Sequence, residues 1–177
     1  MKYLVISDIH GSLYYMKKAL DVFNNDNCDK LIILGDLYYH GPRNNLPELY
    51  NPMEVSKLLN NIKDKIICVK GNCDAFVDEM ISEFKFNELE KITINNKNII
   101  FTHGHIYNID NPIDDCDVLI YGHFHTGFIN IKDNKIFINS GSISLPKNNT
   151  PNSYLIIEDN NIYLKDFNNQ TIDKIKL

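Results

Sequence analysis

The chain has 177 residues, of which 44% are hydrophobic and 23% are charged, and its formal net charge is −5 at pH 7. This length and hydrophobic fraction predict one domain, residues 1–177, and exclude a second core of comparable size. The mild acidity excludes a general attraction to nucleic acid or anionic membranes, so a phosphate-bearing substrate would need local positive charge, such as bound cations.

The sequence shows no sign of a targeting segment, a membrane span or paired cysteines. The N-terminal stretch MKYLVISDIHGS has an apolar run of only four residues before an acidic one, which does not fit a signal peptide. No apolar stretch approaches the roughly 20 residues that span a bilayer, so we expect no membrane partner. The four cysteines form no CxxC pair, and we expect reduced thiols in a cytoplasmic protein. They are Cys28, Cys68, Cys73 and Cys116.

The first half of the chain alternates between short apolar runs and helical patterns. The apolar runs, which we predict to be buried strands, are residues 3–6, 31–34 and 66–69. Residues 12–25 have apolar side chains at helical spacing, with Ser12 as the expected N-cap. Residues 51–62 predict a second helix, with Pro52 near its first turn. This alternation is typical of βαβ units and a largely parallel sheet.

The second half has the pattern of antiparallel strands. Residues 91–104 predict two strands around an Asn-rich turn, and residues 117–121 predict another strand. Residues 128–139 and 153–167 each alternate polar and apolar side chains around an Asp-Asn turn, which predicts two hairpins. We therefore expect a mixed α and β chain whose two β-sheets pack face to face.

Five of the apolar strands end in metal-binding types of residue, usually beside glycine. In open α/β sheets, ligands bind beyond the carboxyl ends of the strands. Each Gly-Asp or Gly-Asn dipeptide alone is an ordinary turn, but five of the six histidines also lie at these strand ends. The residues at the five ends are Asp8 and His10; Asp36; Asn72, Cys73 and Asp74; His103 and His105; and His123 and His125.

Carboxylate, imidazole and amide groups suit Mn, Fe, Zn or Ni better than a soft metal. Seven of the strand-end residues are candidate ligands, which is too many for one ion and about right for two. They are Asp8, His10, Asp36, Asn72, His103, His123 and His125. Two ions roughly 3.5–4 Å apart could lower the pKa of a bridging water and clamp a phosphoryl group. A bridging carboxylate would relieve the repulsion between the ions, and Asp36 is the residue we expect to bridge.

The ordered motifs Asp-x-His, Gly-Asp, Gly-Asn, His-Gly-His and Gly-His-x-His span residues 8–125. In this order they resemble the calcineurin-like metallophosphoesterases. The likeness to the YfcE-like bacterial phosphodiesterase branch extends to HGPRNNLPE, GNCD and NSGSISLPKNNTPNSY, and so covers nearly the whole chain. The resemblance implies an αββα sandwich of four layers, with two mixed sheets flanked by helices.

The resemblance also implies how the ligands divide between two divalent ions, most commonly manganese in this branch. Asp8, His10 and His125 would hold the first ion, and Asp36 would bridge to the second. The second ion would be held by Asn72, His103 and His123. The implied activity is cleavage of small phosphodiesters, and relatives commonly form dimers or tetramers.

Cys73 departs from the family pattern. Most members have histidine after Gly-Asn, and that histidine protonates the leaving group. A thiol with an ordinary pKa of roughly 8.5 could donate a proton only weakly. We interpret Cys73 as a poor replacement for the general acid, with a metal ligand, a covalent nucleophile and a disulfide as lesser alternatives.

Other candidates lie outside the seven ligands. His40 and Arg43 follow Asp36 by four and seven residues and could contact the phosphate, or form an ordinary surface loop. His105 could orient His103. The tyrosines Tyr38 and Tyr39 could stack on a base or aryl group, although packing is the simpler reading. Residues 140–142 are expected to be a structural turn.

Three functions remain open from the sequence. The first is a two-metal phosphodiesterase acting on a small phosphodiester, which the complete ligand set favours. The second is a phosphomonoesterase or nucleotidase at the same site, and the third is a non-catalytic scaffold on the same fold. The acidic balance of the chain argues against a long nucleic acid as substrate, because such a substrate would normally need a broad basic stripe.

Overall fold

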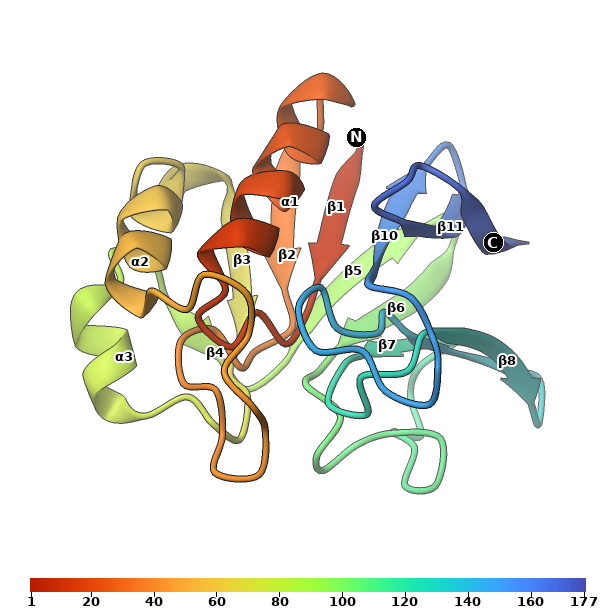
Figure 1. The fold of residues 1–177 in the computed structure, drawn as a ribbon. Helices are drawn as coiled ribbons and strands as arrows, with labels where there is room; N and C mark the ends of the chain where they lie inside the picture. The colour runs from red at the N-terminus through yellow and green to blue at the C-terminus, as the bar shows by residue number, and fades with distance from the viewer.

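The computed structural model describes all residues, 1–177, and contains two β-sheets that lie face to face (Figure 1). The first sheet has seven strands in the order β12 (Thr171–Lys176), β11 (Asn161–Asp166), β10 (Ser153–Glu158), β1 (Tyr3–Ile6), β2 (Lys30–Ile33), β3 (Ile66–Val69) and β4 (Phe86–Asn87). Strands β1 to β4 are parallel, as the alternating first half predicted. Strand β10 joins this sheet antiparallel to β1 and continues it through β11 and β12.

The second sheet has five strands in the order β5 (Glu90–Ile94), β6 (Lys97–Phe101), β7 (Val118–Tyr121), β9 (Lys135–Asn139) and β8 (Phe128–Lys132). Its central strands β6, β7 and β9 are parallel, while β5 and β8 pair antiparallel at the two edges. The predicted hairpin turns have positive φ at both central residues, as two-residue turns between twisted strands require. These pairs are Asn95 and Asn96, Asp133 and Asn134, and Asp159 and Asn160.

Helices cover only the seven-stranded sheet, and in Figure 1 they lie on its outer side. They are α1 (Leu13–Asn25), α2 (Pro52–Asn60), the short α3 (Phe76–Ile81) and one 3₁₀ turn (Lys63–Lys65). The Ser12 hydroxyl accepts a hydrogen bond from the Tyr15 amide at 3.3 Å, which confirms the predicted N-cap. None of these helices is long and apolar enough to cross a membrane.

Alternate residues of β1 fill two different cores. Leu4 and Ile6 pack with the helices, whereas Val5 points toward the five-stranded sheet and packs with Phe101 and Val118. The outer face of the five-stranded sheet is covered by the segment 103–117, whose Ile109 and Ile113 pack on Leu119, Tyr121 and Phe137. The prediction of two packed mixed sheets with flanking helices is confirmed, and a loop takes the place of helices over the second sheet.

Candidate metal centre

The carboxyl ends of β1, β2 and β3 meet those of β6 and β7 at one edge of the two sheets. Backbone hydrogen bonds tie the neighbouring loops together, from the Asp8 amide to the Gly35 carbonyl at 3.1 Å and from the His10 amide to the Asp36 carbonyl at 2.9 Å. The two sheets are joined here because the His123 amide donates to Asp8 Oδ2 at 2.9 Å. The strand ends that the sequence marked as unusual therefore converge on one place.

Five of the predicted ligands have a left-handed backbone, with φ between 48° and 65°. Such a conformation is uncommon for residues other than glycine and clusters at functional sites, where the surrounding structure holds it in place. The five residues are Asp8, His10, Asp36, His123 and His125.

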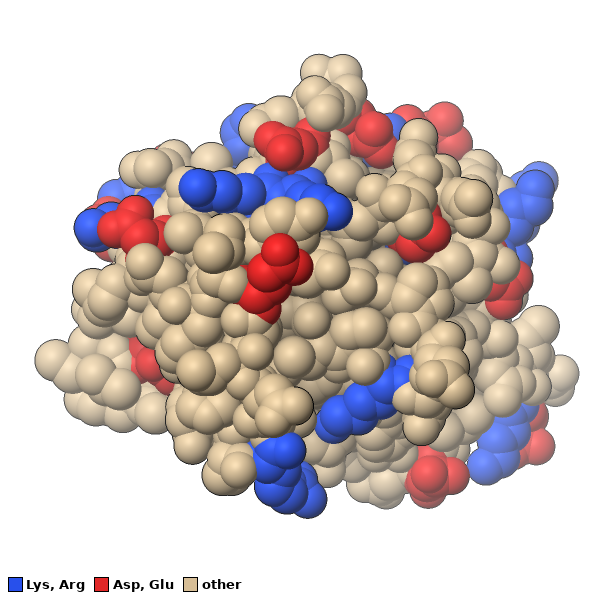
Figure 2. Space-filling view, viewed as in Figure 1, with Lys and Arg blue, Asp and Glu red and all other residues tan.

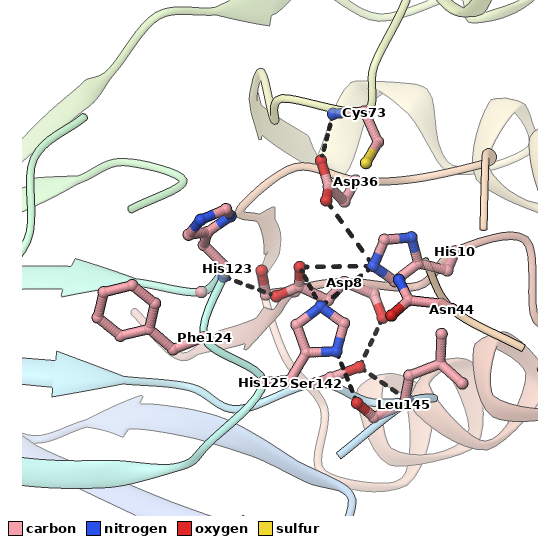
Figure 3. Close-up of polar contacts among 12 residues, drawn as sticks. Asp8, His10, Asp36, Asn44, Cys73, His123, Phe124, His125, Ser142 and Leu145 are labelled. Carbon is pink, nitrogen blue, oxygen red and sulfur yellow. Dashed lines mark hydrogen bonds and ion pairs between the residues drawn. The ribbon is translucent and has the colours of Figure 1, made fainter. Parts of the chain in front are cut away.

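The first cluster consists of Asp8, His10 and His125, all buried. Asp8 Oδ1 lies 3.3 Å from His125 Nε2 and 3.7 Å from His10 Nε2, and the two imidazole nitrogens are 3.3 Å apart (Figure 3). Asp8 Oδ1 is buried and has no hydrogen-bond partner. Since a buried carboxylate oxygen without a partner is costly, this oxygen fits the position of a cation ligand.

The second cluster contains Asn72, His103 and His123. His103 Nε2 lies 3.0 Å from the Asn72 side-chain oxygen and 3.3 Å from His123 Nδ1. Burial, reinforced by the neighbouring His103, lowers the pKa of His123 to about 4. A neutral imidazole is the form that binds a metal ion, so these facing nitrogen and oxygen atoms fit a second cation.

Asp36 lies between the two clusters. Its Oδ2 is 3.7 Å from His10 Nε2 in the first cluster, and its Oδ1 is 3.4 Å from His103 Nε2 in the second. One carboxylate thus presents an oxygen to each group of ligands, which is the geometry expected of a bridging ligand. Figure 3 shows the Asp36 oxygen that faces His10.

Backbone carbonyl groups orient three of the histidine rings. The Nδ1 atoms of His10, His103 and His125 lie 2.6–2.7 Å from the carbonyl oxygens of Tyr39, Leu34 and Leu145 respectively. With Nδ1–H donating to a carbonyl, Nε2 carries the free lone pair and points into the site. His103 is therefore oriented by Leu34 and not through a hydrogen bond to His105, whose exposed ring lies 5.4 Å away.

Asp74 has a supporting role that the sequence did not reveal. Its buried carboxylate accepts hydrogen bonds from the backbone amides of Asp36, Leu37 and Gly71, at 2.7–2.8 Å. Burial, together with the nearby Asp36, raises the pKa of Asp74 to about 6 despite these bonds. The carboxylate fixes the loop that carries Asp36 against the loop that carries Asn72.

The segment 140–145 is more than the structural turn predicted from the sequence. The hydroxyls of Ser142 and Ser144 both donate to the Asp8 carbonyl, at 2.8 and 2.9 Å. Ser142 Oγ also accepts from the Leu145 amide at 2.9 Å, and the Leu145 carbonyl orients His125. Residues far along the chain thus support the left-handed Asp8 and the ring of His125. The SGSIS sequence supplies these two serine hydroxyls, but only the fold shows that they bond to the Asp8 carbonyl.

Cys73 lies at the edge of the site and is half-buried and unbridged. Its amide donates to Asp36 Oδ1 at 2.8 Å, and its sulfur lies 3.4 Å from the Asn72 side-chain nitrogen. The sulfur also lies within 4.8 Å of ligand atoms of His10 and Asp36. Burial, and then the Asp36 carboxylate, raises the pKa of the Cys73 thiol to about 12.

A cleft of about 590 Å³ opens over both clusters. Arg43 lines it, as the sequence suggested, and so does Lys147, which the sequence reasoning missed. His40 does not line it, because its ring lies 4.8 Å from the ring of Tyr39 and 5.4 Å from that of Tyr50. The lining residues are His10, Asp36, Tyr39, Gly41, Pro42, Arg43, Asn44, Asn72, Cys73, His123, His125 and Lys147.

Comparison with known proteins finds similarity along nearly the whole chain. The calcineurin-like phosphoesterase superfamily domain matches residues 1–161. The phosphodiesterase YfcE of Escherichia coli K12 is 37% identical over 175 residues, which are 97% of this chain and 95% of that protein. The solved structure of YfcE, a phosphoesterase from E. coli, matches with a TM-score of 0.96 and 34% identity, covering 99% of both chains.

More distant structures share the fold alone. Wild-type Vps29 of Entamoeba histolytica complexed with Zn²⁺ matches with a TM-score of 0.61 and 22% identity, covering 100% of this chain and 98% of that one. The family match over most of the chain and the similarity to YfcE along nearly its whole length lead to the same assignment. This chain belongs to the calcineurin-like phosphoesterase superfamily.

Proposed function

We propose that this chain, acting as one domain of residues 1–177, is a metal-dependent hydrolase of small phosphodiesters. The observation that carries the proposal is the position of Asp36, which directs one oxygen toward each of two clusters of nitrogen and oxygen ligands. Membership of the family implies divalent metal ions, and YfcE is a phosphodiesterase. The last strand, β12, lies beyond the matched residues but pairs with β11, which supports a single unit.

The residues divide between two cation positions. Asp8, His10 and His125 would hold one ion, and Asp36 would bridge to the other. Asn72, His103 and His123 would hold the second ion. When bound, two such ions supply positive charge that acidifies a water and neutralises a phosphoryl group. Imidazole, carboxylate and amide ligands without a required thiolate favour Mn, with Fe, Zn or Ni as alternatives.

The remaining cleft residues would bind and orient the substrate. Arg43 presents a planar group of donors that matches two phosphoryl oxygens, and Lys147 adds a second positive charge in the same cleft. His40 would act only indirectly through the tyrosines on which it packs. Cys73 lines the cleft beside Asp36, where its S–H could donate a proton weakly to a departing alkoxide.

A monoesterase on the same site is the second candidate, because two cationic side chains in one cleft could also bind a dianion. The scaffold alternative is weaker, because all seven ligand positions are filled and converge. A long nucleic acid is disfavoured as substrate. On the face shown in Figure 2, basic side chains are scattered among acidic and neutral ones and form no continuous stripe.

The test is hydrolysis by metal-stripped protein of bis(4-nitrophenyl) phosphate and of 4-nitrophenyl phosphate, with and without added Mn²⁺. The proposal predicts Mn²⁺-dependent cleavage of the diester and little cleavage of the monoester. An Asp36→Asn variant should lose the Mn²⁺-dependent activity. Preferential cleavage of the monoester would support the second candidate, and no activity on either ester by folded, Mn²⁺-loaded protein would contradict both.

A further inference from the structure

A second cavity of about 290 Å³ adjoins the metal cleft and differs from it in chemistry. Tyr39 and Cys73 line both cavities, so the two adjoin each other at these side chains. Six of the eight residues around the second cavity are hydrophobic, compared with two of twelve around the cleft. The eight residues are Tyr38, Tyr39, Tyr50, Pro52, Cys73, Ala75, Val77 and Asp78.

Two polar groups of the second cavity, on Tyr38 and Asp78, have partners within the protein. The Tyr38 hydroxyl lies 2.7 Å from the Ser82 hydroxyl, and the Asp78 carboxylate accepts a hydrogen bond from the Ala75 amide at 2.7 Å. Val77 and Tyr39, by contrast, are 60% and 42% exposed. The cavity therefore offers mainly apolar and aromatic surface to whatever enters it.

The charges also restrict what can enter. Arg43 and Lys147 line the metal cleft, whereas no basic residue lines the second cavity and Asp78 is its only charged residue. A second phosphate would find no cation there. A cavity of about 150 Å³ can hold a benzene ring, so this larger space has room for an aromatic ring together with its linking atoms.

We propose that this second cavity binds an uncharged aromatic ester group of the substrate while the phosphodiester group lies in the metal cleft. The inference rests on the proposed diesterase function and specifies its substrate class: a small diester with at least one aromatic, apolar substituent. Tyr39 and Val77 are then specificity-determining residues, and the ester group passes Cys73 on its way into the cavity.

Two phosphinates test the assignment, because they are monoanions like a diester and their P–C bonds are not hydrolysed. Benzyl(methyl)phosphinate carries a ring that can reach the second cavity, and dimethylphosphinate does not. Isothermal titration of Mn²⁺-loaded protein should show the benzyl compound binding about tenfold more tightly, as expected from burial of one aromatic ring.

Val77→Asn places a polar group in the cavity wall and should reduce this preference to threefold or less, leaving dimethylphosphinate affinity unchanged. Met80→Asn is the matched control, because Met80 is an exposed residue of the same helix that does not line the cavity. It should keep the wild-type preference. Val77→Ser provides a second variant if Val77→Asn folds poorly.

Equal affinity of the wild type for both phosphinates, or an unchanged preference in both Val77 variants, would overturn the assignment. Hydrolysis of bis(4-nitrophenyl) phosphate is measured in parallel. If the protein hydrolyses bis(4-nitrophenyl) phosphate but binds both phosphinates equally, the aromatic subsite is rejected and the diesterase function stands. If the benzyl compound binds more tightly and the Val77 variants lose this preference, but no diester is hydrolysed, the subsite is supported and the diesterase function is rejected.

Discussion

At the scale of single residues, the centre depends on groups that hold ligands as well as on the ligands. Asp74 shows this most clearly, because its carboxylate accepts hydrogen bonds from three backbone amides on two loops. A carboxylate offers two acceptor oxygens, whereas an amide offers one acceptor and would turn its NH₂ group toward backbone donors.

We therefore predict that Asp74→Asn lowers the free energy of unfolding by about 2–3 kcal/mol, since buried amides lose their acceptor. Misplacement of Asp36 should also weaken Mn²⁺ binding. Urea unfolding and Mn²⁺ titration measure the two effects. Asp78→Asn is a matched control, because Asp78 is also buried but accepts from the Ala75 amide alone. An equal loss of unfolding free energy in Asp74→Asn and Asp78→Asn would show that the three-amide arrangement has no special role.

Cys73 stands where the resemblance to the wider superfamily leads us to expect a histidine. If the thiol is a weak general acid, good leaving groups should react far faster than poor ones. Replacement by the usual imidazole, Cys73→His, should then raise the rate for alkyl esters by as much as about 10²-fold, the lower end of general-acid effects, with little change for 4-nitrophenyl esters.

The measurement is kcat/KM across diesters whose leaving alcohols differ in pKa. Cys73→Ala serves as the control that removes the S–H without adding an acid, and it should be at least as sensitive to the leaving group as the wild type. The general-acid interpretation fails if the wild type and Cys73→His show the same sensitivity.

At the scale of elements, the carboxyl ends of β1 and β7 approach each other closely. A Cβ atom on Gly122, which directly follows β7, would overlap the Ser7 hydroxyl and lie 2.6 Å from Asp8 Oδ2. Glycine is required here because two backbone segments from different sheets must pass side by side.

Gly122→Ala should therefore weaken Mn²⁺ binding by at least about tenfold, in the range seen when the supports of metal ligands are removed. Gly127→Ala is the comparison, because its added Cβ would meet Ser153 Oγ at 2.9 Å, away from the ligands. That variant should lose some stability and keep its Mn²⁺ affinity. Calorimetric titration separates the two outcomes, and an unchanged affinity of Gly122→Ala would contradict the steric argument.

The elements also show how far the sequence could be interpreted. Periodicity and turn residues predicted β1 to β3, helices α1 and α2, and the hairpins around Asp-Asn turns. The six-residue helix α3 and the strand β12 were missed. Neither buries an apolar face, since α3 buries only Asp78 and β12 is largely exposed at a sheet edge. Their structure depends on neighbours more than on local sequence.

For the candidate site, residue types at strand ends led to the prediction of seven ligands, and the structure brings these seven residues together. The supports could not be predicted in this way. Ser142 and Ser144 act on a residue more than 130 positions earlier. Lys147 belongs to the NSGSISLPKNNTPNSY stretch, but its sequence does not show that this lysine reaches the cleft. Such partners are set by how the two sheets pack, which no local pattern records.

At the scale of the whole molecule, the proposed centre connects the two sheets. Asp8, His10, Asp36 and Asn72 follow strands of the seven-stranded sheet, and His103, His123 and His125 follow strands of the five-stranded sheet. Bound cations would therefore link the two halves of the fold, and they would also offset the repulsion between the Asp8 and Asp36 carboxylates.

Mn²⁺ should consequently stabilise the entire molecule against unfolding, and not only the loops around the site. Ligand that binds only the folded state at about 100 times its Kd adds roughly 2.7 kcal/mol per site, so the melting temperature should rise with Mn²⁺ concentration and fall on chelation. Thermal melting followed by far-ultraviolet circular dichroism measures this. Asp36→Asn, which removes the charge facing both clusters, should lose most of the Mn²⁺-dependent increase. If only local probes near the cleft respond while the global transition stays unchanged, the cations do not couple the sheets.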